Sequence, residues 1–330
     1  MSSFTHKKRK RYHCYLVIIA VIFLTAGITA LVKNRSRITT FNKNDWAIGI
    51  YTGVSPFELR PAEGVVNPVL TASDVNDIKA EFVADPFMIK KDDRWYMFFE
   101  ALNALTNKGV ISLAESQDGL SWDYRKVVLS EPFHLSYPLV FLNDDEYYMI
   151  PESAESGELR LYKALNFPYN WEFTDVLLHG EFGDHVVFED GGTWWIIANG
   201  SPQKHNVTRL FFADSLRGPY SEHPSSPIVR DNASRSRPGG RIPLIDGNRY
   251  WLAQDCKTSY GKRLNAFQIV TLNRVEYVEK SHSINPVLTG GKFRWARRGM
   301  HHIDAHQLED GSFIASVDGY SRSLYIKIEY

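Results

Sequence analysis

Cysteine is scarce in this sequence, with only Cys14 and Cys256 among 330 residues. Cys14 lies in an apolar run near the N-terminus, so Cys256 has no cysteine partner in the remainder of the chain. A disulfide framework is therefore excluded, and the folded part must be stabilised by packing. With 44% hydrophobic and 13% aromatic residues, the chain has enough apolar material for a sizeable core.

The sequence also lacks an excess of charge of one sign, because 38 Lys and Arg residues balance 38 Asp and Glu residues. The distribution is uneven, since residues 1–37 contain eight basic residues and no acid. The remainder then has 30 basic and 38 acidic residues, a net charge of −8. No basic face indicates nucleic acid as a partner.

The longest hydrophobic run covers residues 14–32 and contains no charge. Its length is what a helix needs to cross ~30 Å of hydrocarbon. Five basic residues precede the run and three follow it, and the more positive side tends to stay cytoplasmic. We therefore expect a basic cytoplasmic tail (1–13), a signal-anchor helix (14–32), a stem (33–45) and a lumenal or extracytoplasmic domain (46–330). A cleaved signal peptide is the alternative, although no clear A-x-A site follows.

This orientation makes the chain a single-pass type II membrane protein, placed in the Golgi if its source is eukaryotic. Sequons occur at Asn34, Asn206 and Asn232. In a eukaryotic secretory lumen, Asn206 and Asn232 are the expected glycosylation sites.

Helical periodicity is nearly absent after residue 45, where aromatic and aliphatic runs are broken by Asp, Gly and Asn. Five segments align without gaps: DPFMIKKDDRWYMFFE (85–100), YPLVFLNDDEYYMIPE (137–152), DHVVFEDGGTWWIIAN (184–199), GRIPLIDGNRYWLAQD (240–255) and IDAHQLEDGSFIASVD (303–318). Each segment reads as a strand, a tight turn and a second strand that opens with an aromatic or large apolar pair. We expect these pairs to pack between neighbouring repeats.

A third-strand signal follows the first three copies, at residues 113–122, 162–171 and 212–220. A repeat of about 50 residues with three or four short strands is typical of a β-propeller. The sequence therefore predicts an all-β, five-bladed β-propeller over residues 46–330. The strand-like segment WAIGIYTG (46–53) is expected to pair with the last blade and close the ring.

The first strand of each blade lines the channel of a propeller, so the starting residues of the copies should share one rim. If Asp92 and Asp93 form the first turn, Asp85 lies opposite Glu100. The same rule pairs Tyr137 with Glu152, Asp184 with Asn199, Gly240 with Asp255 and Ile303 with Asp318. The expected acidic rim is Asp85, Glu100, Glu152, Asp184, Asp255, Asp304 and Asp318.

Carboxylates that crowd together cannot all ionise at low cost, so some of their pKa values should rise. Carboxyl pairs with divergent pKa values carry out glycosidic-bond chemistry, one as acid and one as base or nucleophile. The candidate catalytic residues are Asp85, Glu152, Asp184 and Glu100. The candidate substrate-binding residues are Tyr137, Arg241, Asp255, His301, His302, Asp304 and Asp318. The alternative is that these acids only hydrogen-bond loop backbone.

Basic residues gather before the fourth and fifth channel strands, at Arg235, Arg237, Arg241, Arg297, Arg298, His301 and His302. They suit an anionic group on a sugar ligand, or they only neutralise the acidic rim. His302, Asp304 and His306 alternate along a strand and share a face, but this spacing is no established metal signature. We expect no metal and no cofactor.

Several segments resemble the N-terminal propeller region of the plant glucosamine inositolphosphorylceramide transferases: FVADPF (82–87), HLSYPLVF (134–141), MIPES (149–153), GELRLYKA (157–164), GGRIPLIDGNRYWLAQDCKTSYGKR (239–263) and MHHIDAHQL (300–308). The resemblance implies a propeller of the glycoside-hydrolase and levansucrase kind, in a membrane-anchored protein that works on glycans or glycolipids. It also implies that Asp85 corresponds to the first-blade aspartate that is base or nucleophile in glycosidase propellers. The plant proteins continue into a C-terminal glycosyltransferase domain that does not follow Tyr330 here, so their transferase activity is not expected.

Two functions remain open from the sequence. One is an enzyme that hydrolyses or transfers a glycosyl group with its rim carboxylates. The other is a non-catalytic glycan- or glycolipid-binding propeller that assists a separate glycosyltransferase. A pure scaffold is disfavoured, because the first three copies offer acids and a tyrosine whereas the last two bring glycine, arginine and histidine.

Overall fold

The computed structural model describes Thr25 and residues 37–329. Residues 45–321 form one compact unit, and residues 37–44 with 322–329 belong to a second. The signal-anchor expected over 14–32 lies, apart from Thr25, outside the described residues. In the part of the chain that is described, no helix is long and apolar enough to cross a membrane.

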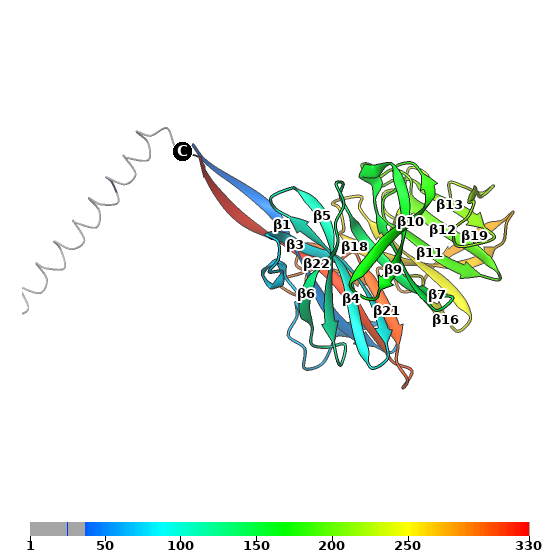
Figure 1. Cartoon of the computed structure of the whole chain (residues 1–330), viewed down its shortest axis with the longest axis horizontal. Helices are drawn as coiled ribbons and strands as arrows, with labels where there is room; N and C mark the ends of the chain where they lie inside the picture. The colour runs from blue at the N-terminus through cyan, green and yellow to red at the C-terminus, as the bar shows by residue number, and fades with distance from the viewer. Residues whose placement is uncertain (1–24, 26–36, 330) are drawn as a thin grey trace, which may run out of the picture. The chain divides into compact units, whose positions relative to one another are not determined.

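Residues 45–321 contain five antiparallel sheets, which are the predicted blades (Figure 1). Blade one contains β3 (Ala80–Lys91), β4 (Arg94–Asn103), β5 (Lys108–Ser116) and β6 (Asp123–Leu129). Blade two contains β7 (Ser136–Asn143), β8 (Glu146–Glu152), β9 (Glu158–Asn166) and β10 (Asn170–His179). Blade three contains β11 (His185–Asp190), β12 (Thr193–Asn199), β13 (Thr208–Ala213) and β14 (Ser221–Glu222).

Blade four is interrupted and contains β15 (Arg237–Pro238), β16 (Leu244–Ile245), β17 (Asn248–Asp255), β18 (Arg263–Leu272), β19 (Tyr277–Ser281) and β20 (Leu288–Thr289). Blade five contains β21 (Ile303–Gln307), β22 (Phe313–Glu329), β1 (Arg37–Gly53) and β2 (Leu59–Pro61). Two short 3₁₀ turns, η1 (Ala72–Asp74) and η2 (Ala154–Ser156), lie between strands. The innermost strands of blades five, one, two, three and four contact one another in turn. The segment after β15 pairs with β21 through Gly240 and Ile303, so the ring around the channel is closed.

The last blade is closed by the first strand of the described chain, as the sequence predicted. β1 lies between β22 and β2 in one sheet, so a strand from before blade one completes blade five (Figure 1). Closure of this kind removes a free sheet edge, which would otherwise expose unpaired backbone groups. The stem expected over 33–45 is part of β1 from Arg37 onward.

The aromatic pairs are largely core residues, in agreement with the structural role expected for them. Trp195 and Trp251 are buried in one apolar cluster that joins blades three and four. Trp95 is buried with Ile314 in the cluster that joins blades one and five. Apolar packing between blades therefore holds the ring together without any disulfide.

The predicted hairpin register is wrong in blades one and two by one residue. Ala84 lies opposite Glu100, and Ser136 lies opposite Glu152. The cause is a bulge in each first strand, because the register shifts between Ala84 and Phe87 and again after Ser136. In both bulges the residue before a proline has positive φ, +54° at Asp85 and +47° at Tyr137. The bulges turn these side chains away from the position that plain alternation assigns.

The register prediction holds in blade three but not in blades four and five. The Asn199 N–H donates to the Asp184 carbonyl oxygen, as expected of facing residues. In blade four, β15 pairs Pro238 with Ala253 and ends at Pro238. Gly240 therefore lies beyond the paired strand and is not opposite Asp255. In blade five, Ile303 faces Val317 instead of Asp318.

Candidate functional site

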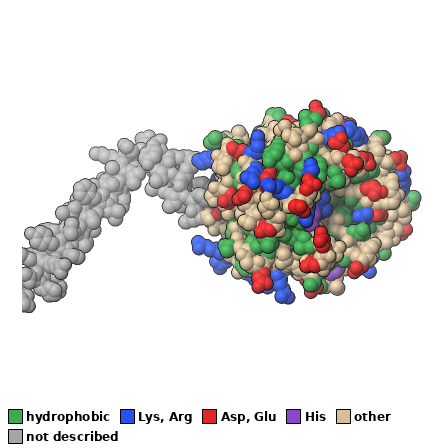
Figure 2. All heavy atoms as spheres, turned by 60° about the horizontal axis from the view of Figure 1, so that its bottom comes forward, with side chains coloured by type: hydrophobic (Ala, Val, Ile, Leu, Met, Phe, Trp, Pro, Cys, Tyr) green, Lys and Arg blue, Asp and Glu red, His purple; other side chains and the backbone are tan. Residues whose placement is uncertain are grey.

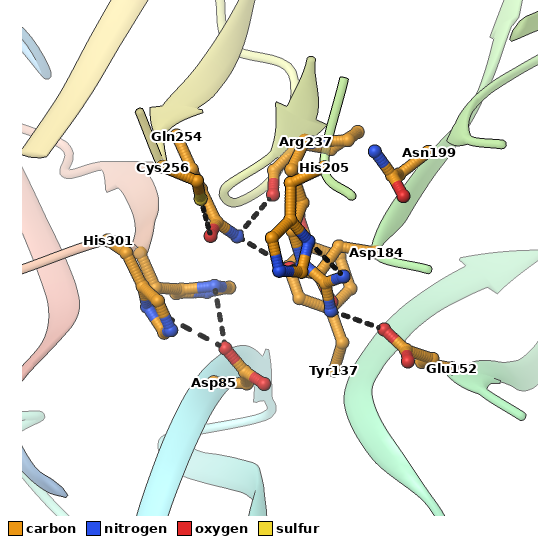
Figure 3. A network of polar contacts seen from close by, with 12 residues as sticks. Asp85, Tyr137, Glu152, Asp184, Asn199, His205, Arg237, Gln254, Cys256 and His301 are labelled. Atoms are coloured by element: carbon orange, nitrogen blue, oxygen red, sulfur yellow. Dashed lines mark hydrogen bonds and ion pairs between the residues drawn. The ribbon is translucent and has the colours of Figure 1, made fainter. Parts of the chain in front are cut away.

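The structure brings acids from the first three blades to one end of the channel, together with an arginine from blade four and a histidine that directly precedes the first strand of blade five. Figure 3 shows Asp85, Glu152 and Asp184 directed toward a common centre, with Arg237 and His301 beside them. All five side chains are buried. We call this group the acid centre.

Arg237 joins the carboxylates of the acid centre. Its Nε donates to Asp184 Oδ2 at 2.7 Å, and one terminal nitrogen donates to Asp184 Oδ1 and to Glu152 Oε2, both at 2.8 Å. Gln254 adds a bond from its amide nitrogen to Asp184 Oδ2 at 2.5 Å. A Cβ at Gly183 would lie 2.7 Å from a terminal nitrogen of Arg237, so glycine is needed where the arginine passes.

The surroundings drive the proton affinities of Glu152 and Asp184 apart. Burial raises the pKa of Glu152 to about 8, against the lowering effect of Arg237 and with a further rise from Asp184. Burial also acts to raise the pKa of Asp184, but Arg237 and a hydrogen bond from Glu152 outweigh it and lower that pKa to about 2. At neutral pH one carboxyl is therefore protonated beside one that is ionised.

Asp85 is the third carboxyl of the acid centre, and its side chain makes the fewest hydrogen bonds of the three. Burial, followed by the charges of Asp184, Asp318 and Glu100, raises its pKa well above the usual range. Its Oδ1 is buried and makes no hydrogen bond within the described residues. This oxygen lies 3.9 Å from His301 Nδ1 and 4.0 Å from the same atom of His302.

His301 is fixed from two sides. Its Nδ1 is bonded to Asp318 Oδ1 at 2.8 Å, and the Trp46 ring stacks on its imidazole with centroids 4.1 Å apart. The Tyr260 ring meets the same imidazole edge-on at 5.2 Å and also lies 5.3 Å from the Arg237 guanidinium carbon. Aromatic side chains from β1 in blade five and from the loop between β17 and β18 in blade four therefore cover one side of the acid centre.

Other predicted site residues occupy different surroundings. The Tyr137 hydroxyl bonds the backbone of Gly240 across the channel, accepting from its N–H and donating to its carbonyl oxygen. Glu100 lies 3.3 Å from the Nε2 of His134, whose Nδ1 accepts from a backbone N–H. Asp255 pairs with the half-exposed Arg263.

A second polar group lies further along the channel strands. Arg241 Nε donates to Asp304 Oδ1 at 2.7 Å, and its terminal nitrogen donates to the carbonyl oxygens of Met88 and Val140. His306 Nε2 lies 3.0 Å from Asp304 Oδ2. Arg241 therefore links blades one, two, four and five, and its charge is neutralised within the protein.

Metal-ligand geometry within the described residues occurs at Asp85, His301 and Asp318, whose ligand atoms lie within 4.8 Å of one another. The alternating set of His302, Asp304 and His306 does not form such a group there. Both nitrogens of His302 are buried without a hydrogen-bond partner in the part of the chain described.

The two expected glycosylation sites lie in loops of blades three and four. The Asn206 amide nitrogen donates to Asp231, and its oxygen accepts from Ser201. The Asn232 oxygen accepts from the Ser234 N–H, and its side chain is half-buried. On the face shown in Figure 2, acidic and basic side chains are interspersed around a hollow, without a broad basic patch.

The sequence does not single out Arg237, Gln254 or Tyr260 as site residues. Arg237 belongs to the basic group around the start of the fourth channel strand, from which the sequence analysis predicts Arg241 as the substrate-binding residue. Gln254 and Tyr260 lie within the long blade-four segment that resembles the plant family. The only available signal for them was that resemblance, because neither residue type stands out by itself.

Comparison with known proteins identifies the relatives of this propeller. Residues 39–320 match the family described as glucosamine inositolphosphorylceramide transferase 1, N-terminal. The proteins of that name from Oryza sativa subsp. japonica and Arabidopsis thaliana are each 36% identical over 84% of this chain. The chain spans only 40% and 39% of their respective lengths.

Solved glycoside hydrolases share the fold at low identity. A thermostable family-43 glycoside hydrolase matches 80% of this chain and 96% of its own, with a TM-score of 0.55 and 15% identity. The Cellvibrio cellulosa alpha-L-arabinanase matches 74% of this chain and 90% of its own, with a TM-score of 0.52 and 17% identity. These matches support the five-bladed fold.

Proposed function

Because the chain belongs to the family of the glucosamine inositolphosphorylceramide transferase 1 N-terminal region, we propose that its propeller carries out glycosidic-bond chemistry on a glycan or glycolipid. The relatives' name describes a transferase and joins a sugar, glucosamine, with a lipid, inositolphosphorylceramide. The fold is shared with glycoside hydrolases. The acid centre supplies the groups that such a reaction requires.

The observation that carries the proposal is the divergence of the pKa values around Arg237. Glu152 holds a proton up to about pH 8, while Asp184 stays ionised in the same cluster. An acid that is still protonated at neutral pH is what a departing sugar oxygen needs. Arg237 keeps Asp184 charged and Glu152 in place without itself titrating.

The roles follow from these environments. Glu152 donates its proton to the glycosidic oxygen while the bond from that oxygen to the anomeric carbon breaks. Asp85, in its ionised form, takes a proton from the water or sugar hydroxyl that attacks the anomeric carbon. The positive charge that develops on the sugar ring favours ionised Asp85, which the surrounding carboxylates otherwise disfavour.

The substrate need not be anionic. The Arg237 and Arg241 guanidinium groups each bond protein carboxylates, so neither requires a negative ligand for neutralisation. Tyr260, which is only partly buried, offers aromatic surface beside the acid centre, and an aromatic face suits a sugar ring. We therefore favour a neutral sugar at the acid centre, with any anionic group of a glycolipid outside it.

The test is a substrate screen with the full chain in detergent micelles. Panels of glycans and glycolipids are incubated with wild type, Asp85→Asn and Glu152→Gln, and products are followed by mass spectrometry. Asp310→Asn and Glu309→Gln are matched controls, because both residues are exposed in a turn. We expect turnover in wild type and controls and at least a ~100-fold loss in each acid-centre variant. Full turnover in both variants would refute the proposal.

A glycan-binding propeller without catalysis is the second candidate. It is favoured by the high pKa of Asp85, because a protonated Asp85 cannot act as a base. The propeller corresponds to about 40% of the length of its curated relatives, so the match does not assign their transferase activity to this region. Tight binding of a glycan in the same screen, with no product at any pH, would decide for this candidate.

The membrane location is a separate proposal, which rests on the basic tail and the apolar run at 14–32. We propose a type II orientation with the propeller in the secretory lumen. Expression in eukaryotic cells should then give a species that an endoglycosidase shortens, and Asn232→Gln should remove one glycan. Unmodified protein that protease digests in intact microsomes would refute this orientation.

A further inference from the structure

The segment that carries Asp85 is held by side chains of blade five. The Asp85 N–H donates to Asp318 Oδ2 at 3.0 Å, and the Met88 N–H donates to Asp304 Oδ2 at 2.6 Å. Between them, the Ser316 hydroxyl donates to the carbonyl oxygen of Pro86 at 2.8 Å. All three blade-five side chains are fully buried.

These bonds replace what the bulge removes from the sheet. Within blade one, the ladder is interrupted between Ala84 and Phe87, so Asp85 and Pro86 have no regular partners on β4. Asp85 also has φ of +54°, a conformation that costs about 1–3 kcal/mol in a residue other than glycine. Such a conformation persists only when neighbouring contacts impose it.

Blade two contains the same kind of bulge but supports it differently. There the residue before the proline is Tyr137, with φ of +47°. Its side chain reaches across the channel to the backbone of Gly240, and so is used for structure. At Asp85 the support comes instead from the neighbouring blade, and the carboxyl oxygen Oδ1 has no hydrogen-bond partner among the residues that the structure describes.

We propose that Asp318, Ser316 and Asp304 are positioning residues that hold the Asp85 carboxyl toward the substrate in the acid centre. The inference rests on the proposed function, and it changes the part assigned to Asp304 and Asp318 from substrate contact to support of Asp85. Asp318 contributes most, because it fixes the Asp85 backbone with one oxygen and His301 with the other.

Asp318 also acts on Asp85 through its charge. Burial acts to raise the pKa of Asp318, but the bonded His301 outweighs it and keeps Asp318 ionised. This negative charge is one cause of the raised pKa of Asp85. The charged and titratable groups around Asp85 are Asp184, Asp318, Glu100, Arg237, His301, His302, Tyr137 and Tyr260.

The test separates position from charge with two variants of the full chain. Ser316→Ala removes one backbone contact and no charge, whereas Asp318→Asn removes a charge and one of two acceptors. Ser312→Ala, in the turn of the same hairpin, is the control. We expect Ser316→Ala to lower kcat by roughly 10- to 100-fold at unchanged KM, because a displaced catalytic group is costly.

For Asp318→Asn, the carboxyl of Asp85 should titrate at lower pH, which carbon-13 NMR of labelled aspartate measures without any substrate. Asp85→Asn identifies the resonance. If Asp85→Asn is inactive while Ser316→Ala and Asp318→Asn match wild type in kcat, the inference fails and the proposed function stands. If no substrate is turned over, the NMR spectra decide alone: an Asp85 carboxyl resonance that keeps its chemical shift in both Ser316→Ala and Asp318→Asn shows that the carboxyl has not moved, and it overturns the inference. If Asp318→Asn does not fold, the kcat of Ser316→Ala decides.

Discussion

Replacing Glu152 by glutamine should make the protein progressively more stable than wild type as the pH rises from about 5 to about 8. Burial raises the pKa of Glu152 from 4.5 to about 8 in the folded protein. Folding therefore takes up a proton at Glu152 between these two values, and the wild type loses stability as the pH rises through this window. Glutamine has no proton to lose, so this loss is absent from the variant.

The size of the effect follows from the shift. Each pKa unit corresponds to about 1.4 kcal/mol, so the full shift corresponds to at most roughly 5 kcal/mol of unfolding free energy. Glutamine can keep the contacts of the protonated acid, because its oxygen accepts from Arg237 and its amide can donate to Asp184. We therefore expect little change at pH 5 and a stabilisation of several kcal/mol near pH 8.

The assay is urea unfolding of wild type and Glu152→Gln at about pH 5, 6.5 and 8, followed by tryptophan fluorescence. Glu309→Gln, in an exposed turn, controls for the loss of a surface charge. Asp85→Asn measures the proton uptake of the other carboxyl with a raised pKa. Parallel pH profiles for wild type and Glu152→Gln would show that Glu152 is already ionised in the folded protein, and the acid role would lose its basis.

Three further predictions concern the channel. Gly240→Ala should lower the free energy of unfolding by at least about 3 kcal/mol in thermal unfolding, because its Cβ would lie 1.7 Å from the Ile303 carbonyl oxygen. Gly291→Ala has a similar positive φ but open space around it, so in the same experiment it should cost about 1 kcal/mol. Tyr137→Phe should cost about 1–3 kcal/mol by leaving the Gly240 N–H unpaired, and an unchanged melting temperature would contradict the bond across the channel. Arg237→Met should lower the free energy of unfolding by about 3–5 kcal/mol near neutral pH, because buried carboxylates lose their cation. The loss should be smaller in acid, where the carboxylates are protonated, and urea unfolding at two pH values measures the difference.

The blades could be predicted from the sequence because each hairpin repeats the same alternation of apolar and polar residues. The aromatic pairs mark the second strands, and burial of Trp195 and Trp251 between blades confirms why they recur. Ring closure by residues 46–53 was also predictable, because an unpaired strand before the first repeat has an obvious partner in the last blade.

The side-chain arrangement at the rim was less predictable, because it depends on local backbone geometry. The bulges at Asp85 and Tyr137 arise from positive φ before a proline, which no hydrophobic pattern reveals. They shift the register by one residue, enough to change which groups face each other. Arg237 rather than Arg241 reaches the acid centre because β15 carries it past Gly183, which has no side chain to obstruct the guanidinium.

Because the fifth blade is completed by the last strand of the propeller, the acid centre can form only late in synthesis. The ribosome produces blades one to three, with Asp85, Glu152 and Asp184, long before β22 exists. Until Asp318 and Ser316 emerge, the Asp85 segment lacks the partners that hold its backbone. A nascent chain therefore carries these acids in water, with their ordinary affinity for protons. The acid centre is therefore complete only when the ring closes, so incomplete chains lack the arrangement of carboxyls on which the proposed chemistry depends.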